Sequence, residues 1–172
     1  PDILRGLRLK KLTDESVEYT ASTSFDGILL TPVVKINTAH MVMLVKQDIV
    51  DKSQGVLCLK GLKRIPQDMQ LDPALEDIHM NVEAFLSEKI GRTAGGQLNL
   101  AKSRNDQVST AIRMALRDYL LQIISGITEV QTVILDKAAE HLDTVMPGYT
   151  HLQHAQPTTL AHHLIAYYDA LR

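Results

Sequence analysis

The stretch that decides the fold is residues 103–142, SRNDQVSTAIRMALRDYLLQIISGITEVQTVILDKAAEHL. It contains no proline, and apolar residues recur every three to four positions, at 108, 112, 116, 119, 123, 127, 130, 134 and 138. This spacing predicts one amphipathic helix, which would be roughly 55 Å long. Because a compact domain of this size is only about 40 Å across, the apolar stripe is expected to need partners, either further helices or other subunits.

Helical patterns also surround this stretch. Four further helices are predicted, over residues 31–47, 51–65, 76–90 and 158–172. Their boundaries rest on Thr31, Asp51 and Thr158 as N-caps and on Gly91 as a C-terminal stop. Residues 1–26 show no clear period, and there is little strand signal. The predicted fold class is therefore all-α, with an N-terminal helical domain over 1–102 and the incomplete start of a helix bundle over 103–172.

Composition narrows the classes of function. The chain has 172 residues, of which 45% are hydrophobic and 22% charged, and a net charge of −2. This charge gives no general electrostatic attraction to nucleic acid or to an anionic membrane. The single cysteine, Cys58, cannot form an internal disulfide, which fits a cytoplasmic location. We find no signal peptide, and the longest apolar runs, near residues 40–45, are too short to span a bilayer.

The first chemical motif is SRNDQ, residues 103–107, at the start of the long helix. Ser103 is a candidate N-cap, with Asp106 three residues on as in a capping box. The positive end of the helix and Arg104 would then meet at one point, which suits a carboxylate or phosphate ligand. Asn105 would add a directional donor. The alternative is simply a well-capped helix with an arginine in its first turn.

The second motif is PGYTHLQHAQPTT, residues 147–159. Its prolines and Gly148 keep it out of regular helix, and its hydroxyl, imidazole and amide groups suit the positioning of a polar substrate and the movement of a proton. A polar interhelical loop that satisfies its own backbone is the alternative. The spacing of His151 and His154 also raises a metal site. No carboxylate or thiolate lies close in sequence, so no metal is predicted.

Two shorter motifs complete the set. EDIHMNVE, residues 76–83, places Asp77 and His79 at the start of a helix, where acidic residues often serve only the helix dipole. TASTSFD, residues 20–26, is a hydroxyl cluster of the kind found in turns and caps. Neither motif indicates a function by itself.

Together the four motifs, in this order and spacing, resemble argininosuccinate lyase of the fumarase/aspartase superfamily. The resemblance is strong over residues 76–172 and weak over 1–75 apart from TASTSFD. Two positions depart from the family pattern: Lys102 stands where arginine is common, and Ala101 where glycine is common. The resemblance implies a β-elimination that converts argininosuccinate to arginine and fumarate without metal or organic cofactor.

The resemblance also implies roles for individual residues. His151 is the catalytic candidate, assisting proton movement at the reacting centre. The substrate-binding candidates are Ser22, Asp77, His79, Arg104, Asn105, Thr150 and Gln153. The family forms homotetramers through its long helices, and each active site draws on three subunits. Its catalytic serine lies in a GSSxMPxKxN loop that this sequence does not contain. The chain is therefore predicted to be an N-terminal fragment that is inactive alone.

Three other interpretations stay open from the sequence. The chain could belong to a crystallin-like structural protein derived from the lyase, since lyases of this family have been recruited as lens crystallins. It could belong to another fumarate-releasing lyase of the superfamily. It could also be a plain helical assembly module whose polar loops are only caps.

Overall fold

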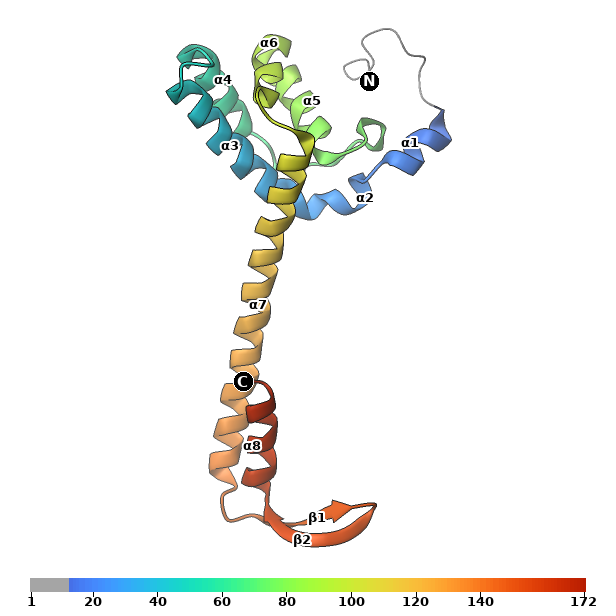
Figure 1. The fold of residues 1–172 in the computed structure, drawn as a ribbon, viewed down its shortest axis with the longest axis vertical. Helices are drawn as coiled ribbons and strands as arrows, with labels where there is room; N and C mark the ends of the chain where they lie inside the picture. The colour runs from blue at the N-terminus through green and yellow to red at the C-terminus, as the bar shows by residue number, and fades with distance from the viewer. Residues whose placement is uncertain (1–12) are drawn as a thin grey trace. The chain divides into compact units, whose positions relative to one another are not determined.

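The computed structural model describes residues 13–172, which form helices connected by turns and loops, and one two-stranded antiparallel sheet (Figure 1). The α-helices are α1 (Asp14–Thr20), α2 (Thr23–Asp26), α3 (Leu30–Lys46), α4 (Lys52–Leu62), α5 (Ile78–Ile90), α6 (Arg92–Gly96), α7 (Arg104–Glu140) and α8 (Leu160–Ala170). Three 3-10 turns, η1 (Gly27–Leu29), η2 (Pro73–Leu75) and η3 (Gln97–Asn99), and two strands, β1 (Val145–Thr150) and β2 (Gln153–Thr159), complete the set. The all-α prediction is confirmed, with one hairpin added.

The chain divides into two compact units. The first ends at Leu116 and the second is Arg117–Arg172, so the division falls within α7. The predicted domain boundary at 102/103 lies before the first three turns of α7, whose Ala111 and Ala115 are buried in the core of the first unit. That boundary stays a prediction. Residues 1–12 of the predicted N-terminal domain lie outside the described part of the chain.

The core of the first unit is made by α3, α4, α5, α6 and the start of α7. Its fully buried side chains include Met41, Leu44, Leu62, Ile78, Leu86 and Leu98. Helices α4 and α5 approach closely because Gly61 has no side chain: a Cβ there would lie 2.6 Å from Leu86 Cδ2. This packing fixes the start of α5, which carries Asp77 and His79.

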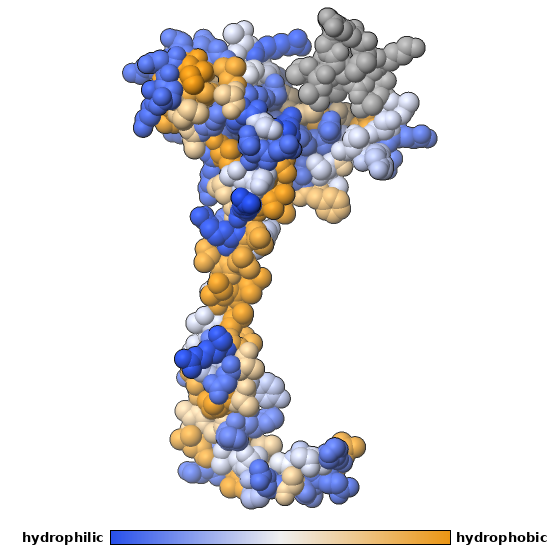
Figure 2. All heavy atoms as spheres, in the orientation of Figure 1, coloured by the Kyte–Doolittle hydropathy of each residue, from blue (hydrophilic) through white to orange (hydrophobic). Residues whose placement is uncertain are grey.

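Helix α7 begins as the sequence predicts. The Ser103 N–H donates to Asp106 Oδ2 at 3.0 Å, and the Asn105 N–H donates to Ser103 Oγ at 3.2 Å, which together make a capping box. Beyond the first unit most of the apolar residues of α7 are open to solvent, whereas Ile127 and Ile134 are half-buried and Ala138 is buried (Figure 2). Those about half exposed or more include Tyr119, Leu120, Leu121, Ile123, Ile124, Val130 and Val133. The predicted stripe is therefore unpartnered at Tyr119, Ile123 and Val130.

The region before α3 is more helical than predicted. Within the described part of residues 1–26 there are two short helices, α1 and α2. Helix α1 is stabilised because Thr13 caps it, accepting from the Ser16 N–H, and Asp14 and Glu15 fill its first turn. A short helix with caps but no apolar period escapes a search for periodicity. Thr31 is not a cap either, since α3 begins at Leu30 and continues directly from η1.

One helical stretch is longer than the apolar runs from which the sequence predicts no membrane span. By length and composition alone, Asp14–Lys46 could cross a membrane, whereas the runs near residues 40–45 are only a part of it. In the structure α3 buries Leu30, Val33, Met41 and Leu44 against its neighbours. Packing in the protein core accounts for part of the apolar character of this stretch, since 39% of its most apolar window is buried.

The polar stretch 147–159 forms most of the hairpin. β1 pairs antiparallel with β2, from Val145 opposite Thr159 to Thr150 opposite Gln153, with a bulge beside Gly148. The prolines exclude helix as predicted, but at this place extended backbone replaces the expected loop. Strand β2 ends at the N-cap of α8, which is Thr159 rather than the predicted Thr158.

Candidate active site

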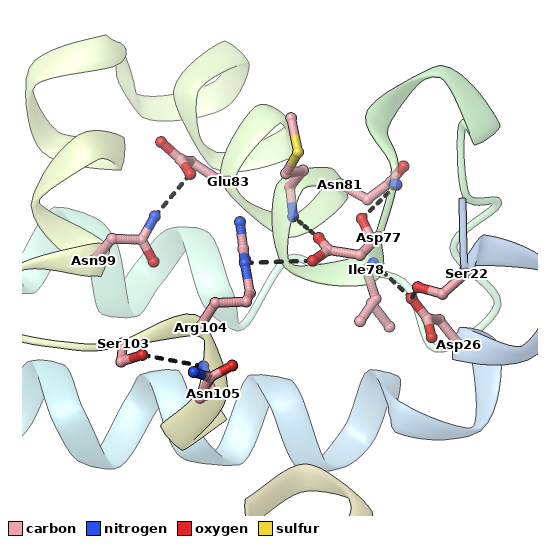
Figure 3. Close-up of polar contacts among 11 residues, drawn as sticks. Ser22, Asp26, Asp77, Ile78, Asn81, Glu83, Asn99, Ser103, Arg104 and Asn105 are labelled. Carbon is pink, nitrogen blue, oxygen red and sulfur yellow. Dashed lines mark hydrogen bonds and ion pairs between the residues drawn. The ribbon is translucent and has the colours of Figure 1, made fainter. Parts of the chain in front are cut away.

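The centre of the candidate site is an ion pair between the starts of α5 and α7 (Figure 3). Asp77 caps α5 by accepting the Met80 N–H on Oδ1 at 2.8 Å. Its other oxygen, Oδ2, lies 3.3 Å from Arg104 Nε. Because Asp77 contacts the guanidinium through Nε, the two terminal nitrogens stay available for another acceptor. Arg104 Nη1 is buried without a hydrogen-bond partner among the described residues.

His79 lies beside this pair, on the buried face of α5. Only 4% of its surface is exposed, and neither ring nitrogen has a hydrogen-bond partner within residues 13–172. Burial lowers the pKa of His79 below its ordinary value, opposed by the nearby Asp77 carboxylate and assisted by the charge of Arg104. The ring is therefore held as neutral imidazole, with one donor and one acceptor to offer.

A second cation, Lys102, lies in the linker before α7. Its Nζ donates to Oδ1 of Asn37, a fully buried side chain of α3. Burial, together with the charge of Arg104, lowers the pKa of Lys102 to about 8, while Glu83 opposes the shift. The cost of keeping two cations close together in a partly buried place is reduced when an anion binds between or beside them.

The hydroxyl motif 20–26 packs against the start of α5. Ser22 Oγ donates to Asp26 Oδ2 at 2.8 Å, and the same oxygen accepts the Ile78 N–H at 3.0 Å. The Ser22 N–H also donates to Glu76 O at 2.8 Å. Asp26 thus joins two segments that lie 52 residues apart, and Figure 3 shows Ser22 and Asp26 beside the residues that precede α5.

The remaining candidates lie in the second unit, on the hairpin. Thr150 and Gln153 pair across its end, and His151 and Leu152 form the turn between them with φ of 51° and 63°. Positive φ at both positions is the pattern of a type I′ turn, which normally takes asparagine and glycine. Backbone strain of this kind concentrates at functional sites. All four of these residues are exposed.

The structure therefore divides the predicted site residues into two groups. Ser22, Asp77, His79, Arg104 and Asn105 belong to the first unit, and Thr150, His151 and Gln153 to the second. Among the described residues, no group of three His, Cys, Asp or Glu side chains could hold a metal ion.

Three further residues contact this part of the first unit but are not predicted from the sequence: Asp26, Asn37 and Lys102. Asp26 was within a quoted motif, and its spacing of four from Ser22 was the available signal. Lys102 was noticed only as a departure from a family pattern. Asn37 gave no signal, because an asparagine inside a helix shows its role only through the lysine that contacts it, 65 residues away.

Comparisons with known proteins show the family to which this chain belongs. A family model described as lyase matches residues 19–172. The argininosuccinate lyase of Heliobacterium mobile is 45% identical over 170 residues, covering 95% of this chain. That of Methanocaldococcus jannaschii is 41% identical over 175 residues, covering 99% of it. Among solved structures, EDDS lyase in complex with formate is 34% identical over 91% of this chain, with a TM-score of 0.75.

The match covers only part of each relative. This chain spans 37% of the Heliobacterium mobile protein, 36% of the Methanocaldococcus jannaschii protein and 31% of the EDDS lyase chain. The resemblance to argininosuccinate lyase is nevertheless confirmed over nearly the whole of these 172 residues. Since the lyase model also matches far more than half of the sequence, the chain belongs to the lyase family.

Proposed function

We propose that this chain supplies the N-terminal part of an argininosuccinate lyase. In the proposed reaction, a base removes a proton from the carbon next to a substrate carboxylate. The electron pair left behind forms the double bond of fumarate, and the carbon–nitrogen bond breaks. The guanidinium nitrogen leaves with the bonding electrons and is protonated, giving arginine.

The observation that carries this proposal is the way Arg104 is held. Asp77 takes its Nε, and Nη1 is buried without a partner among the described residues. A buried guanidinium N–H is costly to leave unpaired, and a carboxylate is the acceptor that suits it best. Argininosuccinate carries three carboxylates, so an enzyme that binds it needs cationic and N–H donors of this kind. The N-terminus of α7 adds a favourable dipole at the same place.

The hairpin is proposed to supply the groups near the reacting carbon. Thr150 would donate its hydroxyl to a carboxylate on the fumarate side, and His151 would assist proton movement. Gln153 would shape the turn that holds them. The family's catalytic serine belongs to a loop absent from these 172 residues. We therefore expect no fumarate release from this chain alone.

The long helix is proposed to assemble copies of the protein, with a homotetramer as the expected state. The support is the exposed apolar stripe of α7, where Ile123, Ile124 and Val133 are each more than half exposed. Contiguous apolar surface of this kind is usually covered by another helix. Light scattering on the purified chain would show its oligomeric state, and a clean monomer at high concentration would contradict this assignment.

A lyase with a different substrate is the competing candidate. The observation that favours it is the identity of 34% with EDDS lyase, at a TM-score of 0.75. Both candidates would release fumarate, a dicarboxylate, so Arg104 and Lys102 would suit either substrate.

A fusion enzyme separates these candidates. The chain is joined to the C-terminal part of the Heliobacterium mobile enzyme, in place of the N-terminal part that it matches. Fumarate release is then followed by ultraviolet absorbance with argininosuccinate and with other N-substituted aspartates. Turnover restricted to argininosuccinate supports the proposal. A folded fusion that cleaves only another substrate supports the competing candidate and refutes the first.

A further inference from the structure

The linker between η3 and α7, residues 100–102, is held from both sides by long-range contacts. On one side His40 Nε2 donates to Leu100 O at 2.7 Å. One turn earlier on the same helix, Asn37 accepts from Lys102 Nζ. On the other side, η3 is tied to α5, because Asn99 Nδ2 donates to Glu83 Oε2 at 2.7 Å. The linker is thus fixed to α3 and its preceding turn to α5.

The backbone of this linker does not hold its shape unaided. Ala101 has a φ of 56°, in the left-handed region that only glycine adopts without cost. A non-glycine residue stays there when the surrounding contacts impose the conformation. The contacts of Leu100 and Lys102 flank Ala101 directly, so they are the restraints nearest to it.

The linker leads straight into the candidate site. Ser103 follows Lys102 and starts the capping box, and Arg104 follows Ser103. A change in the path of 100–102 would therefore shift the first turn of α7, and with it Arg104 and Asn105. Displacements of about 1 Å in a binding group cost a large part of its effect.

We propose that His40, Asn37 and Lys102 are positioning residues, which set the place of Arg104 and Asn105 by clamping residues 100–102 to α3. These residues act through the first turn of α7. Their effect on catalysis rests on the proposed function, whereas their effect on the conformation of this turn does not.

The test compares amide hydrogen exchange, followed by NMR on the 172-residue chain, between variants of the clamp and the parent. His40→Ala removes one contact and His40→Gln keeps an N–H donor in its place. Lys102→Met removes the other contact at similar length, and Lys60→Met, on the exposed face of α4, is the matched control. We expect exchange at the Ser103 and Asn105 amides to rise about tenfold in His40→Ala and Lys102→Met. Amides of α4 should keep their rates, and Lys60→Met and His40→Gln should stay near the parent.

Two exchange results would overturn the proposal. One is unchanged exchange at Ser103 and Asn105 in both His40→Ala and Lys102→Met. The other is an equal rise over α4, which would show a general loss of stability. In the fusion enzyme, His40→Ala should raise KM several-fold with a smaller change in kcat and an unchanged urea midpoint. An inactive parent fusion would count against the proposed function, while the exchange difference would still stand.

Discussion

His79→Leu is expected to make the folded chain more stable while weakening the candidate site. His79 is 4% exposed, and neither ring nitrogen has a partner within the described residues. A neutral imidazole buries one donor and one acceptor, and an unsatisfied buried polar group costs about 1–3 kcal/mol. Leucine fills a similar volume without polar atoms, at a shape cost of about 1 kcal/mol. We expect a net gain of at least about 1 kcal/mol in the free energy of unfolding near neutral pH.

The same substitution should remove the part of the pH dependence of the free energy of unfolding that His79 causes. Burial lowers the pKa of His79 in the folded chain below its ordinary value of 6.5. Below that value the unfolded chain binds a proton that the folded chain does not, so the free energy of unfolding falls as pH falls. The slope is at most about 1.4 kcal/mol per pH unit, and it ends at the folded pKa. His79→Leu has no such group, so its advantage over the parent should grow as the pH falls below about 6.5.

Urea unfolding followed by circular dichroism measures both effects. His162→Leu, at an exposed position of α8, is the matched control and should leave the stability near that of the parent. The reasoning fails if His79→Leu is less stable than the parent by more than about 1 kcal/mol. It also fails if both proteins lose stability equally in acid. In the fusion enzyme His79→Leu should also lower turnover. A buried imidazole without a partner lowers the stability of the fold, and such a group is retained where it contacts a ligand.

Three further predictions follow from the backbone and from Lys102. Ala101→Gly should raise the urea midpoint by the equivalent of about 1 kcal/mol, because φ is 56° there; no change would mean that the residue relaxes out of the left-handed region. Gly95→Ala should cost about 1–3 kcal/mol, since a Cβ would lie 2.6 Å from Ser87 Oγ and 3.0 Å from its Cα. Its control, Gly126→Ala in the exposed middle of α7, should stabilise by about 1 kcal/mol. Burial lowers the pKa of Lys102 from 10.5 to about 8, so between these values only the unfolded chain keeps the proton, and the parent should gain stability relative to Lys102→Met as pH rises. Unfolding titrations of the two proteins should show this growing difference, and a constant difference would contradict the shift.

The features that the sequence predicts correctly are those set by neighbouring residues. The span of α7 followed from its apolar spacing, and the capping box of Ser103 from a four-residue pattern. The end of α5 at Gly91 is predicted because glycine adopts positive φ without steric cost, and the φ of Gly91 is 89°. Asp51 caps α4 as expected, accepting the Ser53 N–H at 2.9 Å. Each of these signals acts within one or two helical turns.

The hairpin shows where local signals fail. Its pairing depends on two strands meeting across a turn at His151 and Leu152, which lack the usual asparagine and glycine. Pro147 and Pro157 face each other in the ladder, where proline weakens any strand pattern. The prolines indicated only that helix was excluded, so a loop was the natural expectation.

The candidate site shows the same division between local and long-range information. Asp77 and Arg104 were each found as first-turn residues of separate helices, but nothing in the sequence indicated that they form an ion pair. The same holds for Ser22 and Asp26, whose contact with the start of α5 spans 52 residues. Contacts of this kind are created when the helices pack, so the residue types were predictable and their partners were not.

Steady-state kinetics of Arg104→Gln in the fusion enzyme test most directly whether the first turn of α7 binds a carboxylate of the substrate. Arg113→Gln, at an exposed position further along the same helix, is the matched control. Loss of a charge-assisted hydrogen bond should lower kcat/KM for argininosuccinate by about tenfold or more in Arg104→Gln, with Arg113→Gln near the parent. Equal kcat/KM in both variants, with the fold intact, would contradict the assignment of this site.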